Sequence, residues 1–159
     1  MEPKGRNDDH VFDYSKITDQ LYIGSDLCKR GVCLIHGEEF KALGVEFEIN
    51  MSRENNELPP KDMKIGYLWL PVADGYSPTQ LQLDIGTSAM NDIINQEKNV
   101  YVHCKNGHGR SPTMVIAYFV RYQGYFPDDA ATFIKEIRPE IHIEDTQKKE
   151  LYNFKKRWS

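Results

Sequence analysis

The distribution of apolar and polar residues along the chain predicts an alternation of strands and helices. Residues 45–51 alternate between the two kinds, which is typical of a strand with one buried face. Residues 65–72 are apolar almost throughout, as expected of a parallel strand covered on both faces. Residues 99–102 form a shorter apolar run, and a further strand is predicted over residues 17–24, where Gly24 closes the run.

Between these strands lie segments whose apolar residues recur at the spacing of a helix. The longest covers residues 81–96, and the side chains expected to face inward are those of Leu81, Ile85, Met90, Ile93 and Ile94. A second helix is predicted over residues 111–123 and is closed by Gly124. The other predicted helices cover residues 38–43 before Gly44, Pro127 to just before Pro139, and a last segment from about Asp145 with Leu151, Phe154 and Trp158 on its apolar side.

Strands joined by helical segments of this length need crossover connections, which are right-handed and give a mostly parallel sheet. We therefore predict one α/β domain with a mostly parallel central sheet and helices on both faces. The chain has 159 residues, 40% of them hydrophobic, which is enough for one such core. Residues 1–13 are polar and lack periodicity, so we expect a disordered tail followed by a domain of residues 14–159.

Charge and the lengths of the apolar runs exclude several functions. The net charge of −4 offers no general attraction for nucleic acid, so any anion binding must be local. No apolar run reaches the roughly 20 residues that span a bilayer, and the first residues lack the apolar core of a signal peptide. We therefore expect a cytoplasmic protein without stable membrane insertion; its oligomeric state is left open, with a monomer favoured.

The three cysteines, Cys28, Cys33 and Cys104, form neither a disulfide framework nor a zinc pattern, because no CxxC pair or nearby histidine pair accompanies them. Cys28 and Cys33 are interpreted as core or surface thiols. A role for them as redox partners of Cys104 stays open, because thiolates of low pKa oxidise readily. Cys104 itself, between His103 and Arg110, is a candidate nucleophile.

The segment from His103 to Pro112 carries the main candidate chemistry. It contains Cys104 and, after five intervening residues, Arg110, and it lies between the apolar run 99–102 and a predicted helix. The first amides of a helix lack intrahelical partners and carry the positive end of its dipole, so a strand, a turn with glycines and a helix start form an anion site. In such a place Cys104 is expected to be largely thiolate at neutral pH.

The turn is suited to hold a phosphate group. Its amides can surround a tetrahedral dianion, and Gly107 and Gly109 permit the positive φ values that such a nest requires. The planar fork of Arg110 matches two phosphate oxygens. The predicted phosphate-binding residues are Lys105, Asn106, Gly107, His108, Gly109 and Arg110.

A thiolate that attacks a phosphate monoester needs a proton donor for the leaving group. Asp74 is the candidate, because its loop, residues 73–78, follows a buried strand and so lies at the sheet edge where ligands bind. Asp84 is a rival, but it falls within a predicted helix. Ser111 is predicted to donate a hydrogen bond to the sulfur when water, activated by the same Asp74, hydrolyses the phosphocysteine. This scheme requires no metal ion and no other cofactor.

The order His103, Cys104, five residues, Arg110, Ser111 resembles the cysteine-dependent protein tyrosine phosphatases, and specifically the small, atypical dual-specificity phosphatases. The resemblance covers nearly the whole chain, about residues 17–158. Its further parts are Leu21 to Gly24, which looks like the opening strand of the family, Gly44 to Met51 like its second strand, Pro71 to Asp74 like its general-acid loop, and Arg138-Pro139.

The resemblance implies a two-step hydrolysis through a phosphocysteine, with Cys104 as nucleophile, Arg110 as the phosphate-binding arginine and Asp74 as the acid. The substrate expected first is phosphotyrosine in proteins, with phosphoserine and phosphothreonine left open. Lys105 and His108 are basic, as in the loops of phosphoinositide-directed members, so a phosphoinositide or another polyphosphorylated small molecule is the alternative substrate. A non-catalytic module that binds phosphorylated partners is the alternative outside enzymes.

Overall fold

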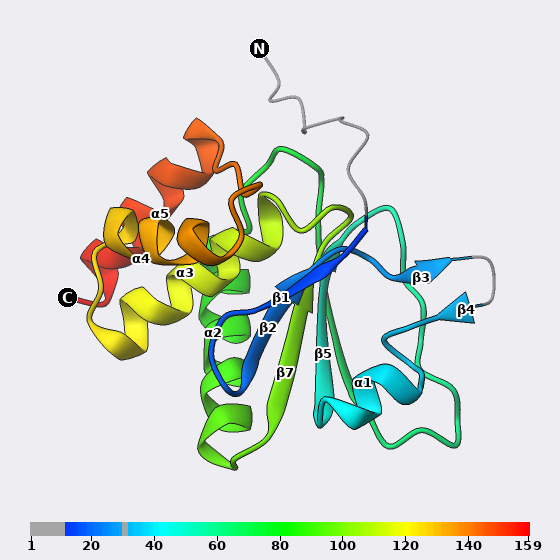
Figure 1. Cartoon of the computed structure of the whole chain (residues 1–159). Coiled ribbons are helices and arrows are strands. Elements are labelled where there is room, and N and C mark those ends of the chain that lie inside the picture. The colour runs from blue at the N-terminus through cyan, green and yellow to red at the C-terminus, as the bar shows by residue number, and fades with distance from the viewer. Residues whose placement is uncertain (1–11, 30–31) are drawn as a thin grey trace.

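The computed structural model describes residues 12–29 and 32–159 and shows a five-stranded sheet flanked by helices (Figure 1). The order of its strands is β1-β2-β7-β5-β6. Their bounds are Tyr14–Lys16 for β1, Leu21–Gly24 for β2, Val45–Ser52 for β5, Gly66–Val72 for β6 and Asn99–His103 for β7. The last four are parallel to one another and β1 is antiparallel to β2, which confirms the predicted mostly parallel sheet.

Helices cover both faces of the sheet, as predicted. The helices α2 to α5 lie on one face, whereas the short α1 and a small hairpin lie on the other (Figure 1). The bounds are Glu38–Ala42 for α1, Gln80–Asn95 for α2, Arg110–Gln123 for α3, Pro127–Ile137 for α4, Asp145–Arg157 for α5, and Cys28–Lys29 and Val32–Cys33 for the hairpin strands β3 and β4. The predicted helices are confirmed, with ends that agree to within about a residue.

The central strand β7 is buried on both faces, and this fixes the place where the loop of Cys104 begins. Val100 and Val102 point into the core beneath the larger helices. Tyr101 points to the opposite face, where its ring packs edge to face on that of Phe40, with the ring centroids 4.8 Å apart. A strand packed on both sides explains the continuous apolar run in the sequence and holds its last residue, His103, firmly.

The helix α3 is also buried nearly all round, from Arg110 to Val120. Its close contact with α2 depends on Gly86, where a Cβ atom would lie 2.5 Å from the terminal methyl group of Met114. Gly86 is thus the point at which the two helices approach each other. This contact also turns α2, so that Leu83, Thr87 and Met90 face inward.

The expectation that Leu81 and Ile85 face inward is wrong, since their exposed fractions are 65% and 44%. The predictions for Met90 and Ile93 are confirmed, and Ile94 is partly buried against the core. The apolar periodicity alone did not distinguish the two possible faces of α2, because Gly86, which sets the contact, has no side chain to count.

Two strand predictions also need correction. Residues 65–72 were expected to be covered on both faces, but β6 lies at the edge of the sheet and Trp69 is 38% exposed. Pro71, which lacks an N–H group, is tolerated there because an edge strand has one row of donors without a neighbour. In residues 17–24 only Leu21–Gly24 is a strand, since Thr18 accepts a hydrogen bond from the amide of Leu21 (3.1 Å) and forms a turn.

The alternation predicted for residues 45–51 ends halfway along β5. Glu48 and Asn50 are buried although both are polar. Each is satisfied by hydrogen bonds: Glu48 contacts two histidines, and the side-chain NH₂ group of Asn50 donates to the backbone oxygen of Asn55 (2.8 Å). Buried polar groups with such partners cost little, which is why the pattern could break without loss of the strand.

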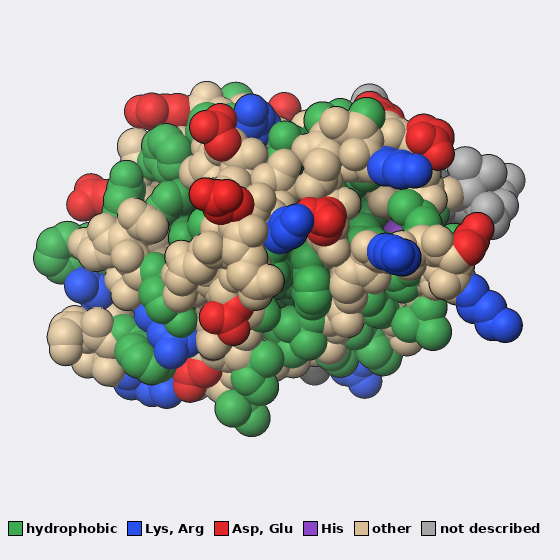
Figure 2. All heavy atoms as spheres, turned by 90° about the horizontal axis from the view of Figure 1, so that it is seen from below, with side chains coloured by type: hydrophobic (Ala, Val, Ile, Leu, Met, Phe, Trp, Pro, Cys, Tyr) green, Lys and Arg blue, Asp and Glu red, His purple; other side chains and the backbone are tan. Residues whose placement is uncertain are grey.

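Of the predicted tail, residues 1–11 lie outside the described residues. Asp13 is described: its amide donates to the hydroxyl of Ser25 (3.1 Å), and its carboxylate lies 2.8 Å from the guanidinium of Arg138. No helix within the described residues is both long and apolar enough to cross a bilayer. At the end of the molecule drawn in Figure 2, acidic and basic side chains are interspersed over the surface.

Candidate active site

The carboxyl ends of β6 and β7 bring the two predicted reactive loops to one edge of the sheet, the upper edge in Figure 1. Asp74 follows the end of β6, and Cys104 directly follows β7. Arg110, the first residue of α3, connects them: its Nη1 atom donates to the backbone oxygen of Val72 (2.8 Å), and its Nη2 atom lies 3.7 Å from the carboxylate of Asp74.

The backbone of the loop 104–109 is held by hydrogen bonds from other segments. Four successive carbonyls accept such a bond: Lys105 from the amide of Asp26 (3.0 Å), Asn106 from Ser25 Oγ (3.0 Å) and Arg138 Nη2 (3.0 Å), Gly107 from Arg138 Nε (2.9 Å), and His108 from the amide of His142 (2.7 Å). In a planar trans peptide the C=O and the next N–H point in opposite directions. The amides of residues 106–109 are therefore turned away from these partners, which is the orientation of an anion-binding nest.

Arg138 is the main support of this loop. Its side chain is 1% exposed, and besides the two carbonyls it contacts the carboxylate of Asp13 (2.8 Å) and donates to the hydroxyl of Ser15 (3.0 Å). The sequence indicated Arg138 only through the family resemblance, because a single arginine before a proline has no pattern that announces such a role.

The two loop glycines have different functions. Gly107 has a φ of 76°, as predicted, and a Cβ atom there would lie 2.4 Å from the carbonyl carbon of Gly24. Gly109 has a φ of −129°, so the prediction of a positive φ is wrong at that residue. Its missing side chain leaves room for Gln147 instead, since a Cβ atom would lie 3.2 Å from the Nε2 atom of that residue.

The sulfur of Cys104 is buried, and its Sγ atom lies 3.4 Å from the hydroxyl of Ser111. The helix α3 begins at Arg110 without a side-chain cap. Its first amides therefore add their dipole to the same place, which favours a negative charge beside the sulfur. The cysteine, the serine and the helix start are arranged as the sequence predicted.

The side chain of Arg110 is 1% exposed and is bound by Glu54, a residue that the sequence did not indicate. Glu54 accepts from Nη1 (2.6 Å) and from Nη2 (3.1 Å), a bidentate pair. Burial would lower the pKa of Arg110, but the nearby Cys104 and Glu54 raise it. Among the described residues nothing accepts a hydrogen bond from the buried Nε atom, so one donor of the fork is left for a ligand.

The carboxylate of Glu54 is strongly held in its charged form. Partial burial alone would raise the pKa of Glu54, but hydrogen bonds from Arg110 and Ser52 lower it to about 2. Glu54 lies in a polar stretch just after β5, where acidic residues are common, so its sequence context gave no signal. Only the fold shows that this stretch passes over Arg110.

His103 is fixed by a second buried carboxylate. Its Nε2 atom lies 2.6 Å from Glu48, and its ring stacks on that of Tyr101 at 5.4 Å. The other oxygen of Glu48 lies 2.7 Å from His36. Burial would raise the pKa of Glu48, but the bonds with His103 and His36 lower it. The strand pattern pointed to neither Glu48 nor His36.

One pocket gathers most of the predicted site residues. It is lined by Asp74, Gly75, Cys104, Asn106, His108, Gly109, Arg110, His142, Glu144 and Gln147. The side chain of Lys105 is exposed and does not line the pocket, whereas that of His108 does. The rival acid Asp84 is on α2, where it pairs with Arg157 (2.7 Å) outside the pocket.

The start of α5 contributes to the pocket, which the sequence did not indicate. Gln147 donates to the backbone oxygen of Tyr76 (3.0 Å), and Thr146 donates to that of Gly75 (3.1 Å). These bonds tie the loop of Asp74 to α5. Gln147 also forms a capping box with Glu144, so its sequence signal was that of a helix start and not of a site.

The expectation that Cys28 and Cys33 are unlinked is wrong. They pair across the hairpin of β3 and β4 and form a disulfide, whereas Cys104 is free. Two cysteines five residues apart give no recognisable spacing, so the link followed only from the hairpin.

The fold and this pocket define a cysteine-dependent phosphatase. The family model described as "Dual specificity phosphatase, catalytic domain" matches residues 28–157. The chain therefore belongs to the dual-specificity phosphatase family.

Two curated relatives differ in the substrates that their names give. A protein of Invertebrate iridescent virus 6, 123R, named as a tyrosine phosphatase, is 31% identical over 91% of this chain and 92% of its own length. The phosphatidylglycerophosphate phosphatase PTPMT2 of Arabidopsis thaliana is 27% identical over 72% of this chain. The match spans about half of that plant protein, 52%.

Solved structures share the fold. The crystal structure of PTPMT1 in complex with PI(5)P matches with a TM-score of 0.80 and 27% identity, over 91% of this chain and 95% of that one. The crystal structure of human DUSP28 matches with a TM-score of 0.75 and 23% identity, over 90% of this chain and 96% of that one. The relatives thus include proteins whose names or ligands point to both proteins and lipids as substrates.

Proposed function

We propose that this protein hydrolyses phosphate monoesters on proteins, phosphotyrosine first, through a phosphocysteine intermediate. The observation that carries this proposal is the arrangement in one pocket of a buried cysteine, a buried arginine with an unused donor, and a carboxylic acid. A module that only binds phosphate has no need for the cysteine or for the acid.

In the first step the thiolate of Cys104 attacks phosphorus and the bond to the leaving oxygen breaks. The loop amides and Arg110 hold the three remaining phosphate oxygens, over which the negative charge is spread in the transition state. Because Glu54 already holds the terminal nitrogens of Arg110, the guanidinium is in place before substrate arrives and offers its Nε donor to the phosphate. Asp74 gives its proton to the leaving oxygen.

In the second step water attacks the phosphocysteine, and Asp74, now a carboxylate, takes the proton from that water. The S–P bond breaks and its electron pair returns to Cys104. Ser111, with its hydroxyl 3.4 Å from the sulfur, donates a hydrogen bond to the departing thiolate. Phosphate leaves, and Asp74, protonated again by the water, is ready for the next cycle.

A second substrate class is favoured by a specific observation. His108 is basic, buried and part of the pocket lining, which supports a contact with an additional phosphate on a substrate. The names of PTPMT2 and of the PTPMT1 complex with PI(5)P point in the same direction. We therefore retain a phosphoinositide or another polyphosphorylated small molecule as the second candidate.

Two measurements test the proposal. Hydrolysis of an aryl phosphate should occur with the native chain and disappear in Cys104→Ser; no turnover by the native chain would leave only the phosphate-binding alternative. Phosphate release is then compared between matched peptides carrying phosphotyrosine, phosphoserine or phosphothreonine and vesicles containing PI(5)P. A much higher kcat/KM on the vesicles would replace the protein substrate with the lipid.

A further inference from the structure

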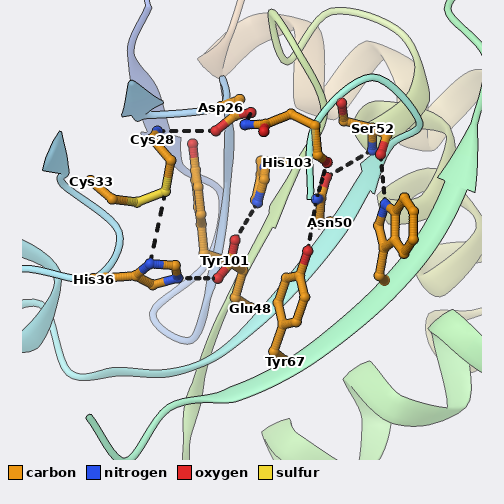
Figure 3. A network of polar contacts seen from close by, with 12 residues as sticks. Asp26, Cys28, Cys33, His36, Glu48, Asn50, Ser52, Tyr67, Tyr101 and His103 are labelled. Carbon is orange, nitrogen blue, oxygen red and sulfur yellow. Dashed lines mark hydrogen bonds and ion pairs between the residues drawn. A yellow bond between two sulfur atoms is a disulfide. The ribbon is translucent and has the colours of Figure 1, made fainter. Parts of the chain in front are cut away.

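A cluster of sulfur and nitrogen atoms lies on the face of the sheet opposite to the larger helices. Cys28 of β3 and Cys33 of β4 are paired across the hairpin, with their Cα atoms 3.8 Å apart and a disulfide between them. The turn after β4, in which the amide of His36 donates to the backbone oxygen of Cys33 (3.2 Å), brings the imidazole over the sulfurs. The Nδ1 atom of His36 lies 3.9 Å from Cys28 Sγ (Figure 3).

The spacing of these atoms suits a small thiophilic cation. The potential ligand atoms of Cys28, Cys33 and His36 all lie within 4.8 Å of one another. Zinc bonds of about 2.3 Å to sulfur and about 2.0 Å to nitrogen, at tetrahedral angles, place neighbouring ligand atoms roughly 3.6 Å apart. The observed separation of 3.9 Å between Cys28 Sγ and His36 Nδ1 is close to that value.

The histidine is already oriented as a metal ligand. Its Nε2 atom lies 2.7 Å from a carboxylate oxygen of Glu48, and the exposed fractions of the two side chains are 4% and 2%. An ionised Glu48 accepts a hydrogen bond from Nε2, which leaves the lone pair on Nδ1, the nitrogen that faces the sulfurs. A carboxylate that fixes the tautomer and raises the basicity of a histidine in this way is the usual outer partner of zinc-bound histidines.

We propose that Cys28, Cys33 and His36 bind one Zn²⁺ ion once the Cys28–Cys33 disulfide has been reduced. An external dithiol supplies the two electrons and two protons that convert the disulfide to two thiols, and it closes its own disulfide in return. Both thiols lose their protons as Zn²⁺ binds, so two Zn–S bonds and one Zn–N bond form and two protons are released. A solvent molecule completes the tetrahedron. Disulfide and zinc exclude each other, because each uses both sulfurs.

This site is connected to the catalytic loop through one carboxylate. Glu48 holds His36 with one oxygen and His103, the residue before Cys104, with the other (2.6 Å) (Figure 3). The zinc-bound and the disulfide states therefore act on the same group that positions His103. The proposal itself concerns the metal and stands whether or not the phosphatase substrate is the one we propose.

The experiment uses the full chain with Cys104→Ser, which removes the catalytic thiol as a competing ligand. The protein is reduced with a dithiol, freed of reductant without oxygen, mixed with excess ZnCl₂ and passed through a desalting column, and its zinc is counted with a chromogenic chelator. We expect one ion per chain after reduction and none in the oxidised sample. Equal zinc in the two samples, or none in either, would overturn the proposal.

Substitutions then identify the ligands. Adding Cys28→Ser or His36→Ala to Cys104→Ser should abolish retention of zinc, whereas His142→Ala, which removes a half-exposed histidine elsewhere, should not. Retention by the His36→Ala protein at the level of the control would remove His36 from the site. If zinc were lost with His142→Ala but retained with Cys28→Ser and His36→Ala, the zinc site would instead lie in the pocket that His142 lines.

A further readout needs no additional substitution and so does not depend on whether the variants fold. Zinc should protect Cys28 and Cys33 of reduced Cys104→Ser protein from alkylation by iodoacetamide, as mapped by mass spectrometry. With Co²⁺ in place of Zn²⁺, an absorption band from thiolate-to-metal charge transfer should appear only in the reduced protein. Unprotected cysteines at saturating zinc would contradict the proposal directly.

Discussion

Glu54 binds both terminal nitrogens of Arg110, at 2.6 and 3.1 Å, and so fixes the only arginine among the described residues that line the pocket. Such a pair orients the guanidinium of Arg110. Its buried charge would be destabilising if the partner Glu54 were removed. The pair explains how a side chain that is 1% exposed stays charged and in place when no substrate is bound.

The Glu54 contact should be visible in the pH dependence of stability. The pKa of Glu54 is about 2 in the folded protein, below its usual value, so the stabilisation is present above roughly pH 4.5 and is lost as the pH falls toward 2. Thermal unfolding followed between pH 7 and pH 2 should therefore show a steeper loss for the native chain than for Glu54→Gln. The substitution Glu136→Gln, at an exposed residue of α4, serves as the control and should follow the native curve. Parallel curves for the native chain and Glu54→Gln would contradict the assignment.

Replacing Asp74 should separate catalysis from binding. Asp74→Asn keeps the shape of the side chain but cannot donate the proton, so kcat should fall by roughly 10²–10⁴-fold while KM changes little. The pH–rate profile should also lose the alkaline limb that reports an acid. Asp84→Asn, on α2 and outside the pocket, is the matched control. If the alkaline limb persisted in Asp74→Asn, another group would have to be the acid.

Ser111→Ala should slow the second step more than the first. A hydrogen bond to a charged group contributes about 1.5–3 kcal/mol, which corresponds to roughly 10–100-fold in rate. Rapid-quench measurements should then show a burst of leaving group followed by slow turnover, with phosphocysteine accumulating on Cys104. Ser88→Ala, on α2, provides the control. Loss of rate without any burst would place the effect of Ser111 before the intermediate.

Two glycines with nearly equal φ angles allow two effects of an added side chain to be separated: backbone strain and steric overlap with neighbouring atoms. Gly107 has φ 76° and Gly124 has φ 73°, but a Cβ atom at Gly124 meets nothing within 4 Å, whereas at Gly107 it would meet the backbone of Gly24. Gly124→Ala should cost only the penalty of the left-handed conformation, roughly 1–2 kcal/mol, and leave kcat intact. Gly107→Ala should cost at least about 3 kcal/mol and abolish turnover. Denaturant unfolding and aryl phosphate hydrolysis measure the two effects, and equal costs would show that Gly24 can move aside.

The elements that pack on both sides were the easiest to predict from the sequence. In β7 and α3 almost every residue is buried, so the apolar run alone defined them, and the motif between them followed. The inward face of α2 was predicted only in part: Leu81 and Ile85 are exposed, because the contact with α3 depends on Gly86, which has no side chain that a sequence pattern could reveal. The edge position of β6 could not be predicted from the apolar residues around Trp69, because a strand of apolar residues can be partly exposed at the edge of a sheet as well as buried at its centre.

The candidate site was predictable where chemistry constrains residue type and spacing, as for Cys104 and Arg110. The residues that orient this chemistry were not. Glu48 and Glu54 are acids in or beside a strand, and their partners His103 and Arg110 lie 55 and 56 residues away along the chain. No local pattern reports a pairing over that distance, because it is created only when β5 and β7 become neighbours.

The hydrogen bonds to the carbonyls of residues 105–108 affect the order in which the parts of the site form during folding. Their donors, which include Ser25, Asp26, Arg138 and His142, come from both ends of the described chain. A chain that has formed its sheet and α3 but has not yet docked the region after α4 would possess Cys104 and Arg110 without an anion cradle. During refolding, phosphatase activity should therefore return after the recovery of secondary structure. Its return would indicate that the segments from both ends of the described chain have docked against the loop.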